Sequence, residues 1–231
     1  MIQQDPNIVA VELVAAALGN LREELVLVGG CSVGLLISDK ARPEVRHTVD
    51  VDLVAEVTSK AEYYALSGRL KSCGFTQSAD GEHFCRWIKG PLILDVMPSD
   101  ESVLGHSTNR WYPKAVKDAE RRTLQSGLEI LVINPPLFLA TKLEAFYGRG
   151  NGDYNHHDME DIINVIDGRP EIVDEVSAAS DELREYLRGE FDELLADESF
   201  VDEIPGHFRP DSISQARVPI VINRITKLAG L

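Results

Sequence analysis

The sequence is poor in cysteine, in basic residues and in long apolar stretches. Its 231 residues include three cysteines, Cys31, Cys73 and Cys85. They are too widely spaced for a disulfide framework or a zinc pattern, which favours a reducing, cytoplasmic location. No apolar run approaches the roughly 18 residues of a membrane span, and this excludes an integral membrane protein. The first residues lack a basic segment followed by an apolar core, so we expect no secretory signal.

Basic residues are outnumbered, with 23 Lys and Arg against 38 Asp and Glu, and the formal net charge is −15. Such a balance excludes a protein that coats DNA, and we expect no sequence-specific DNA binding. The charge is also uneven, because residues 171–204 hold 13 acidic and two basic residues. An acidic run of this kind is typical of a solvated helical face; a docking surface for a basic partner is the alternative.

The hydrophobic pattern changes near residue 135 and predicts two domains. Residues 1–134 mix helices, expected at 6–23, 32–39 and 59–72, with strands at 25–28, 48–57, 83–88 and 92–97 and a strand pair within 119–134. Residues 135–231 form a helical region, with helices expected at 136–147, 156–167, 179–196 and 212–228. The fold class is therefore α+β, a mixed sheet flanked by helices and followed by a helical C-terminal domain.

Acidic residues stand at unusual places in two of the predicted strands. Asp50 and Asp52 lie at i and i+2 in TVDVDLVAEV and would project from the same face. Two anions so close repel each other, and an apolar strand is a costly place for them. Mg²⁺ resolves this conflict, since it binds one or two carboxylates together with substrate phosphates and water. Asp95 in LILDVMP would complete a cluster suited to in-line nucleotidyl transfer. The alternative is an edge strand with one solvated face.

A glycine pair, Gly29-Gly30, follows the strand predicted at 25–28 and precedes Ser32, which would cap the next helix. A strand, a glycine turn and a helix start together form a backbone cradle for phosphate. A tight turn also explains two adjacent glycines. The order of glycine pair, paired acids and third acid favours the phosphate cradle.

Two segments resemble a known family. GGCS (29–32) and RHTVDVD (46–52) resemble the GG-x-S … R-x-T-x-D-x-D signature of nucleotidyltransferase-fold proteins, and more narrowly the AbiEii toxin-like (type IV toxin–antitoxin) family. PLFLATKLEAF (136–146), Arg149 and HDMEDI (157–162) are similar to that family's P-x-x-L-x-x-K-L … R … K-D-x-x-D segment. His157 stands where a basic residue is common. The resemblance covers residues 25–167 and leaves the tail beyond 170 uncovered.

The resemblance implies a nucleotidyltransferase-like sheet and a Mg²⁺-dependent enzyme that moves a nucleoside monophosphate from an NTP, such as ATP, to a hydroxyl of tRNA or protein. A cognate antitoxin would be a partner. By this resemblance Asp50 and Asp52 would bind Mg²⁺, and Asp95 would be a ligand or the base. The nucleotide would be held by Gly29, Gly30, Ser32, Arg46, Thr48 and Lys142, with Asp158 or Asp161 orienting Lys142 or the base. Two alternatives stay open, a small-molecule nucleotidyltransferase of the aminoglycoside type and a non-catalytic nucleotide-binding module.

Several of these residues also have simpler interpretations. Lys142 could be a surface lysine, and Asp158 and Asp161 an exposed helix face. His156 and His157 would point apart on one helix, so we expect no metal there. Cys31 is expected to be a small filler. Trp87 and Trp111 are expected in the core, and the basic residues at 110–122 form either a solvated face or an RNA contact.

Overall fold

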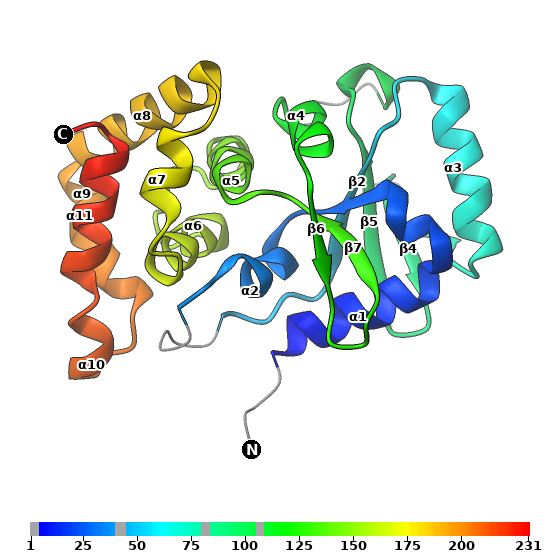
Figure 1. Ribbon diagram of the computed structural model, residues 1–231, viewed down its shortest axis with the longest axis horizontal. Helices are drawn as coiled ribbons and strands as arrows, with labels where there is room; N and C mark the ends of the chain where they lie inside the picture. Colours follow the sequence, from blue (N-terminus) through cyan, green and yellow to red (C-terminus); the bar gives the residue numbers. More distant parts are fainter. Residues whose placement is uncertain (1–4, 40–44, 80–83, 105–108) are drawn as a thin grey trace. The chain divides into compact units, whose positions relative to one another are not determined.

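The computed structural model describes residues 5–39, 45–79, 84–104 and 109–231. It divides into two compact units, which we call the sheet unit and the helical unit (Figure 1). The sheet unit consists of Met1–Gly34 and Arg46–Asn134, and the helical unit consists of Leu35–Val45 and Pro135–Leu231. The short segment 35–45 therefore leaves the sheet unit and belongs to the helical one.

Seven strands of the described residues form one mixed sheet in the order β3-β4-β5-β2-β1-β7-β6. The strands are β1 (Leu25–Leu27), β2 (Val51–Ala55), β3 (Thr76–Gln77), β4 (Arg86–Lys89), β5 (Leu92–Pro98), β6 (Glu120–Thr123) and β7 (Glu129–Val132). Strand β2 is antiparallel to β1 and parallel to β5, and β1 is parallel to β7. The predicted hairpins are both present, as β4–β5 and β6–β7. The α+β prediction with a mixed sheet is confirmed, although the start of the strand predicted at 83–88 lies outside the described residues.

Helices flank the sheet within its unit: α1 (Pro6–Leu18), α3 (Lys60–Ser72) and α4 (Tyr112–Lys117). The side chain of Asp5 caps α1 by accepting a hydrogen bond from the backbone N–H of Asn7 (2.9 Å). The helix predicted at 6–23 ends at Leu18, because Gly19 has φ +57°, which glycine tolerates; the chain continues as the 3₁₀ helix η1 (Gly19–Glu24).

The helical unit is built around α5 (Pro135–Arg149), most of whose residues are buried and which packs against α6, α7 and α8. Its other helices are α6 (His157–Gly168), α7 (Ile172–Ser177), α8 (Asp181–Ala196), α9 (Glu198–Glu203), α10 (Ser212–Gln215) and α11 (Val218–Leu228), with the 3₁₀ helix η4 (Ile204–His207). The helices predicted at 179–196 and 212–228 are shorter than expected, since α8 begins at residue 181 and the second prediction splits into α10 and α11.

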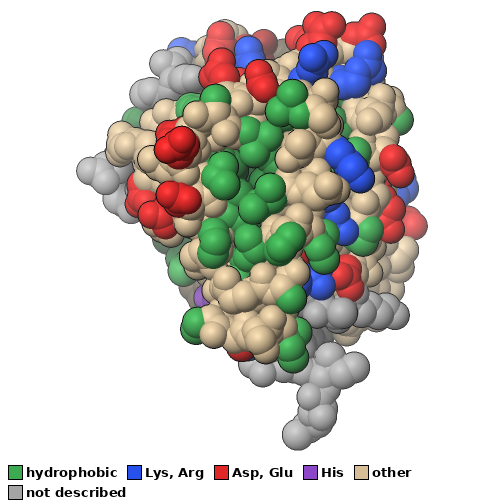
Figure 2. Space-filling model, turned by 90° about the vertical axis from the view of Figure 1, so that its left-hand side faces the viewer, with side chains coloured by type: hydrophobic (Ala, Val, Ile, Leu, Met, Phe, Trp, Pro, Cys, Tyr) green, Lys and Arg blue, Asp and Glu red, His purple; other side chains and the backbone are tan. Residues whose placement is uncertain are grey.

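Helix α8 carries much of the acidic run. It buries Leu183, Leu187, Phe191 and Leu194 on one face, and most of its acidic side chains are exposed. The acidic residues of α8 thus lie on an exposed helical face, as the charge pattern predicts. Figure 2 shows hydrophobic side chains gathered on one face of the C-terminal helices, and Ile213 and Ile220 are among the exposed hydrophobic residues of this unit. No helix in the described part of the chain is long and apolar enough to cross a membrane.

Candidate functional site

The sheet brings two of the predicted acids side by side. Asp52 of β2 lies opposite Asp95 of β5 in the parallel register. Their neighbours Val51, Leu53 and Leu94 are buried, so the alternation along each strand turns both carboxylates to the other face of the sheet. Neighbouring strands thus place these two acids within reach of a common partner.

Asp50 lies just before this strand instead of within it. Strand β2 begins at Val51, and residues 49 and 50 form a bend, so the strand predicted at 48–57 is too long at both ends. Val49 is 72% exposed, which shows that the apolar face of the strand does not extend to it. Asp50 is therefore carried by a loop that other residues must hold in place.

An arginine lies among the acids. Arg86 of β4 pairs with Asp95 in the antiparallel register. Its Nε and Nη2 donate to the two oxygens of Asp95 at 2.9 and 2.7 Å, and Nη2 also donates to Asp50 Oδ2 at 2.8 Å. The side chains of Arg86, Asp50 and Asp95 are 22%, 29% and 16% exposed, so the group is partly buried. The predicted site residues do not include Arg86, which neutralises part of the cluster's charge.

The glycine turn approaches Asp52 closely. Gly29 has φ +65°, and a Cβ placed on it would lie 2.0 Å from Asp52 Oδ2. Only glycine satisfies both conditions, because any side chain would strain the backbone and displace the carboxylate. The turn at Gly29 and the carboxylate of Asp52 thus lie against each other within the sheet unit.

The segment after this turn differs from its prediction. Gly30–Ser32 form the 3₁₀ helix η2, and α2 (Val33–Leu36) is one short turn, where a helix was predicted over 32–39. The Ser32 hydroxyl donates to the carbonyl oxygen of Gly29 at 2.8 Å, so it does not act as the expected helix cap. A helix this short contributes little dipole, and any phosphate binding here depends on backbone N–H groups and close approach.

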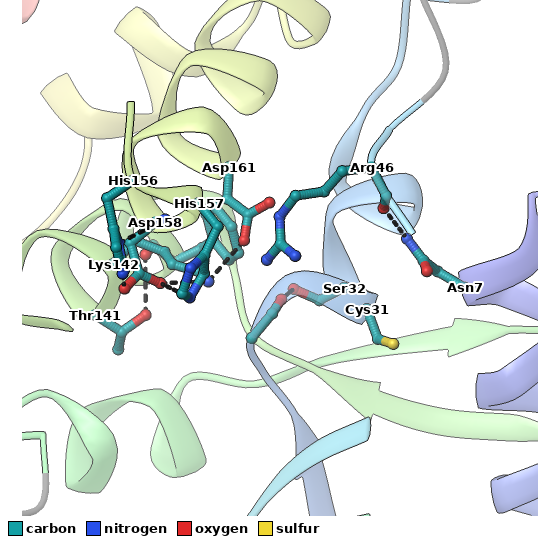
Figure 3. A network of polar contacts seen from close by, with 12 residues as sticks. Asn7, Cys31, Ser32, Arg46, Thr141, Lys142, His156, His157, Asp158 and Asp161 are labelled. Atoms are coloured by element: carbon teal, nitrogen blue, oxygen red, sulfur yellow. Dashed lines mark hydrogen bonds and ion pairs between the residues drawn. The ribbon is translucent and has the colours of Figure 1, made fainter. Parts of the chain in front are cut away.

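Buried Asn7 holds the loop that carries Asp50. Its Nδ2 donates to the carbonyl oxygen of Arg46 (2.8 Å), as Figure 3 shows, and its Oδ1 accepts from the N–H of Thr48 (2.9 Å). Cys31 Sγ donates to the carbonyl oxygen of Asp50 at 3.2 Å. The Thr48 hydroxyl is buried and has no hydrogen-bond partner among the described residues. Asn7 therefore fixes the two predicted nucleotide-binding positions, Arg46 and Thr48, through their backbones.

Cys31 is suited to packing and not to nucleophilic chemistry. Burial raises the pKa of its thiol far above the ordinary value, and the nearby carboxylates of Asp52 and Asp50 raise it further. A thiol that stays protonated is a poor nucleophile. The prediction that Cys31 is a small filler is confirmed by its complete burial.

A second charged cluster lies within the helical unit, between α5 and α6 (Figure 3). Lys142 Nζ lies 2.9 Å from Asp158 Oδ1 and 2.7 Å from Asp161 Oδ2. These three side chains are 5%, 0% and 1% exposed. The interpretations of Lys142 as a surface lysine and of the two acids as an exposed helix face are therefore wrong, since helix packing buries all three.

Arg149 completes the charge balance of this cluster. Its Nε and Nη2 donate to the two oxygens of Asp158 at 2.7 and 2.8 Å. Burial alone would raise the pKa of Asp158, but Arg149 and Lys142 outweigh it and hold that pKa well below its usual range. Burial alone would lower the pKa of Lys142, and Asp161 and Asp158 reverse this. These shifts keep both Asp158 and Lys142 charged near neutral pH.

The two histidines beside this cluster lie together, contrary to the prediction that they point apart. His156 precedes α6 as its cap, and its Nδ1 accepts from the N–H of Asp158 at 3.3 Å. Its ring centroid is 3.9 Å from that of His157. Donor atoms of His156, His157 and Asp158 lie within 4.8 Å of one another, a spacing that a metal ion could bridge. Asp158 already accepts from two cations, and a third positive charge would be repelled, so we assign no metal here.

The tryptophans lie in the core, and two arginines of the basic segment make local contacts. Trp87 and Trp111 are buried, so the prediction that they belong to the core is confirmed. Arg110 lies over the ring of Trp111, at 5.3 Å from its centroid. Arg122 pairs with Glu120 of the same strand. These contacts favour a solvated face over an RNA-binding surface.

The oxygen ligands of the sheet unit fit a hard divalent cation better than the histidine cluster does. Mg²⁺ prefers carboxylates together with phosphate oxygens and water, which Asp50 and Asp52 could complete. Asp95 differs, because both of its oxygens accept from Arg86. A cation held by Asp50 and Asp52 would therefore require Arg86 to yield its contact with Asp50.

No protein-family model matches the sequence, and no curated protein resembles it. An antigenic nucleotidyltransferase-like protein from Paracoccidioides brasiliensis has a similar structure, with 20% identity, a TM-score of 0.51 and a match over 91% of this chain and 97% of that one. The antibiotic-resistance factor ANT(2'')-Ia matches at 12% identity and a TM-score of 0.48, over 84% of this chain and 95% of its own. The protein JHP933 from Helicobacter pylori matches at 12% identity and a TM-score of 0.47, over 98% of this chain and 93% of its own. The first likeness shows that this chain has a nucleotidyltransferase-like fold.

Proposed function

We propose that this chain is a nucleotidyltransferase that moves a nucleoside monophosphate from an NTP to an acceptor hydroxyl and releases pyrophosphate. The observation that supports the proposal best is the meeting of Asp52 and Asp95 at one register of β2 and β5, with Asp50 beside them and the Gly29 turn against Asp52. Acids gathered on one face of a sheet next to a glycine turn suit the binding of a metal-bound triphosphate.

In this proposal Asp50 and Asp52 would hold Mg²⁺, which would neutralise charge on the leaving pyrophosphate and lower the pKa of the acceptor hydroxyl. The Gly29-Gly30 turn would let the phosphates approach the backbone closely. Thr48, whose buried hydroxyl has no partner among the described residues, would donate to the nucleotide. Asn7 and Cys31 would keep the loop of Asp50 in register through the hydrogen bonds described above.

The ion pairs of Lys142 support a different role from the one that the family resemblance implies. Its ammonium is buried and already bound by Asp158 and Asp161, so contact with a triphosphate would require it to give up one of them. We propose instead that Lys142 joins α5 to α6. Asp158 and Asp161 then orient Lys142, as the resemblance implies, but they do so within the helical unit.

The acceptor follows from the resemblance to AbiEii toxin-like proteins, which favours a hydroxyl of tRNA or protein and a cognate antitoxin as partner. A small-molecule acceptor of the aminoglycoside type is the alternative, and the acidic chain would suit a cationic drug. A thermal-shift screen of aminoglycosides with ATP and Mg²⁺ separates the two. A shift with one drug supports the alternative, and no shift with any drug counts against it.

A second candidate function is favoured by Arg86, which supplies to Asp50 and Asp95 a positive charge of the kind that a metal would supply. On this hypothesis the chain binds NTP without turning it over. NTP binding in the absence of divalent cations, with no transfer to tRNA, protein or drug, would support this second candidate.

The proposed function is tested by incubating the chain with α-labelled NTPs, Mg²⁺ and cell extract as a source of acceptors. We expect a labelled product with the wild type and a loss of at least about 100-fold with Asp50→Asn and Asp52→Asn, since each removes a metal ligand. Asp118→Asn, a change to an exposed aspartate of the same unit, should keep full activity. Equal labelling by wild type and Asp50→Asn would reject the assignment.

A further inference from the structure

Arg86 binds acids of the sheet unit that a cation would also bind. The geometry of its hydrogen bonds indicates which of these contacts a cation could replace most easily. It meets Asp95 through two nitrogens and both carboxylate oxygens, at 2.9 and 2.7 Å, a paired arrangement that fixes the guanidinium plane. It meets Asp50 through one nitrogen only, at 2.8 Å, and that nitrogen is shared with Asp95. The contact with Asp50 is thus the single and more easily broken one.

The backbone holds Arg86 in this place. Arg86 and Asp95 are direct partners across the β4–β5 ladder, where facing side chains lie close together. The next residue, Trp87, is fully buried, so the alternation of the strand turns Arg86 to the face of Asp95 and Asp52. A guanidinium positioned by a strand register is a permanent neighbour of the acids, unlike a long side chain that happens to fold over them.

The exposed fractions of the two carboxylates also indicate that Asp50 is the one a cation reaches first. Asp50 is 29% exposed, whereas Asp95 is 16% exposed. A hydrated cation from solvent therefore reaches the carboxylate that Arg86 holds by one bond before the one that it holds by two.

We infer that Arg86 is the resident counter-ion of the acid cluster and sets its affinity for divalent cations. A cation enters by replacing Arg86 at Asp50 and is then held by Asp50 and Asp52, while Asp95 keeps Arg86 and serves as its anchor. This inference rests on the proposed function, because it assumes that the acids bind a metal. It adds a positioning role for Arg86 and makes Asp95 an anchor in place of a ligand.

The role of Arg86 can be tested without an activity assay by measuring Mn²⁺ binding to the chain. Binding is monitored as the loss of the EPR signal of free Mn²⁺. Arg86→Gln should bind Mn²⁺ on the order of tenfold or more tightly than the wild type, because a positive charge next to the ion is removed. Arg86→Lys, which keeps the charge but loses the two-bond contact with Asp95, should fall between them, and it serves if the glutamine variant does not fold. Asp50→Asn added to Arg86→Gln should abolish binding.

Arg69→Gln is the matched control, since Arg69 also makes a two-bond pair, with Glu24 at 2.6 and 2.5 Å, at the surface of the same unit. It changes the net charge by the same amount and should stay within about twofold of the wild type, as screening predicts. Equal or weaker Mn²⁺ binding by Arg86→Gln, with clear binding by the wild type, overturns the inference alone. Absence of binding in every variant overturns it together with the metal-dependent function.

Discussion

The chain builds two clusters from the same materials, carboxylates and a basic side chain, and treats them differently. In the helical unit Lys142, Asp158 and Asp161 are almost completely buried, and the ammonium is bound by both acids. In the sheet unit Arg86, Asp50 and Asp95 remain partly exposed, and one contact is a single hydrogen bond. A buried, fully paired cluster serves structure, whereas a partly exposed one with a replaceable contact can bind a ligand.

The largest expected effect separates the two clusters by stability. Lys142→Met would leave Asp158 and Asp161 buried without their cation, and we expect the free energy of unfolding to fall by about 3–5 kcal/mol. Urea unfolding followed by circular dichroism measures this. Lys227→Met, at an exposed position of α11, should change stability by less than about 0.5 kcal/mol. A Lys142→Met chain that is as stable as the wild type but binds NTP less tightly would contradict this account. It would support the contact between Lys142 and the triphosphate that the family resemblance implies.

Asp50→Asn gives the opposite pattern in the sheet unit. It removes a partly exposed, single contact, so we expect the free energy of unfolding to change by less than about 1 kcal/mol while transfer is lost. The same urea unfolding experiment checks this. A loss of stability as large as that of Lys142→Met would mean that the acid cluster is a structural ion pair too.

Two glycines sharpen the comparison further, because both have positive φ but only one touches an acid. Gly127→Ala adds a Cβ with nothing within 4 Å, and it should cost about 1 kcal/mol of backbone strain alone. Gly29→Ala also strains the backbone, which has φ +65° and ψ −167° there, and pushes its Cβ against Asp52. We expect it to weaken Mn²⁺ binding as well, which Gly127→Ala should leave intact. Equal Mn²⁺ binding by both variants would show that the close approach of Gly29 to Asp52 has no role in the site.

The smallest effect concerns pH and the helical unit. The pKa of Asp158 is held well below its usual range, so its contribution to stability is complete above about pH 4 and is lost as the pH falls further. Arg149→Gln brings that pKa back toward the unfolded value. The variant should therefore be less stable at pH 7, by about 1 kcal/mol, and lose less stability than the wild type between pH 5 and pH 3. Urea unfolding at each pH measures the stability at pH 7 and its loss between pH 5 and pH 3. The same pH dependence of stability in the variant and the wild type would show that Arg149 does not lower the pKa of Asp158.

Local patterns predicted much of the fold. Alternation and turn residues gave both hairpins, and the acid Asp95 was expected beside Asp52, where the register places it. Strand ends and short helices were harder, because tertiary contacts decide them. Asn7 of α1, for example, holds the backbone of Arg46 and Thr48, and the strand begins only at Val51, later than its residues suggest.

Arg86 shows why part of the site escaped prediction. It stands in HFCRWI as one basic residue of an apolar strand, and an isolated arginine in a strand usually faces solvent. Its meaning depends on the β4–β5 register, which spacing alone does not fix. Lys142 escaped for the opposite reason, since only the packing of α5 on α6 shows that it is buried. A charged residue alternating with buried apolar ones, as Arg86 does beside Trp87, is the one signal that was available.

The most direct measurement is anomalous diffraction from crystals of the full chain grown with Mn²⁺ and a non-hydrolysable ATP analogue. We predict a manganese peak coordinated by carboxylate oxygens of Asp50 and Asp52, with Arg86 still paired to Asp95 and the triphosphate on the same ion. Manganese at His156, His157 and Asp158 instead, or an ordered triphosphate bound to Arg86 with no ion at Asp50, would contradict this.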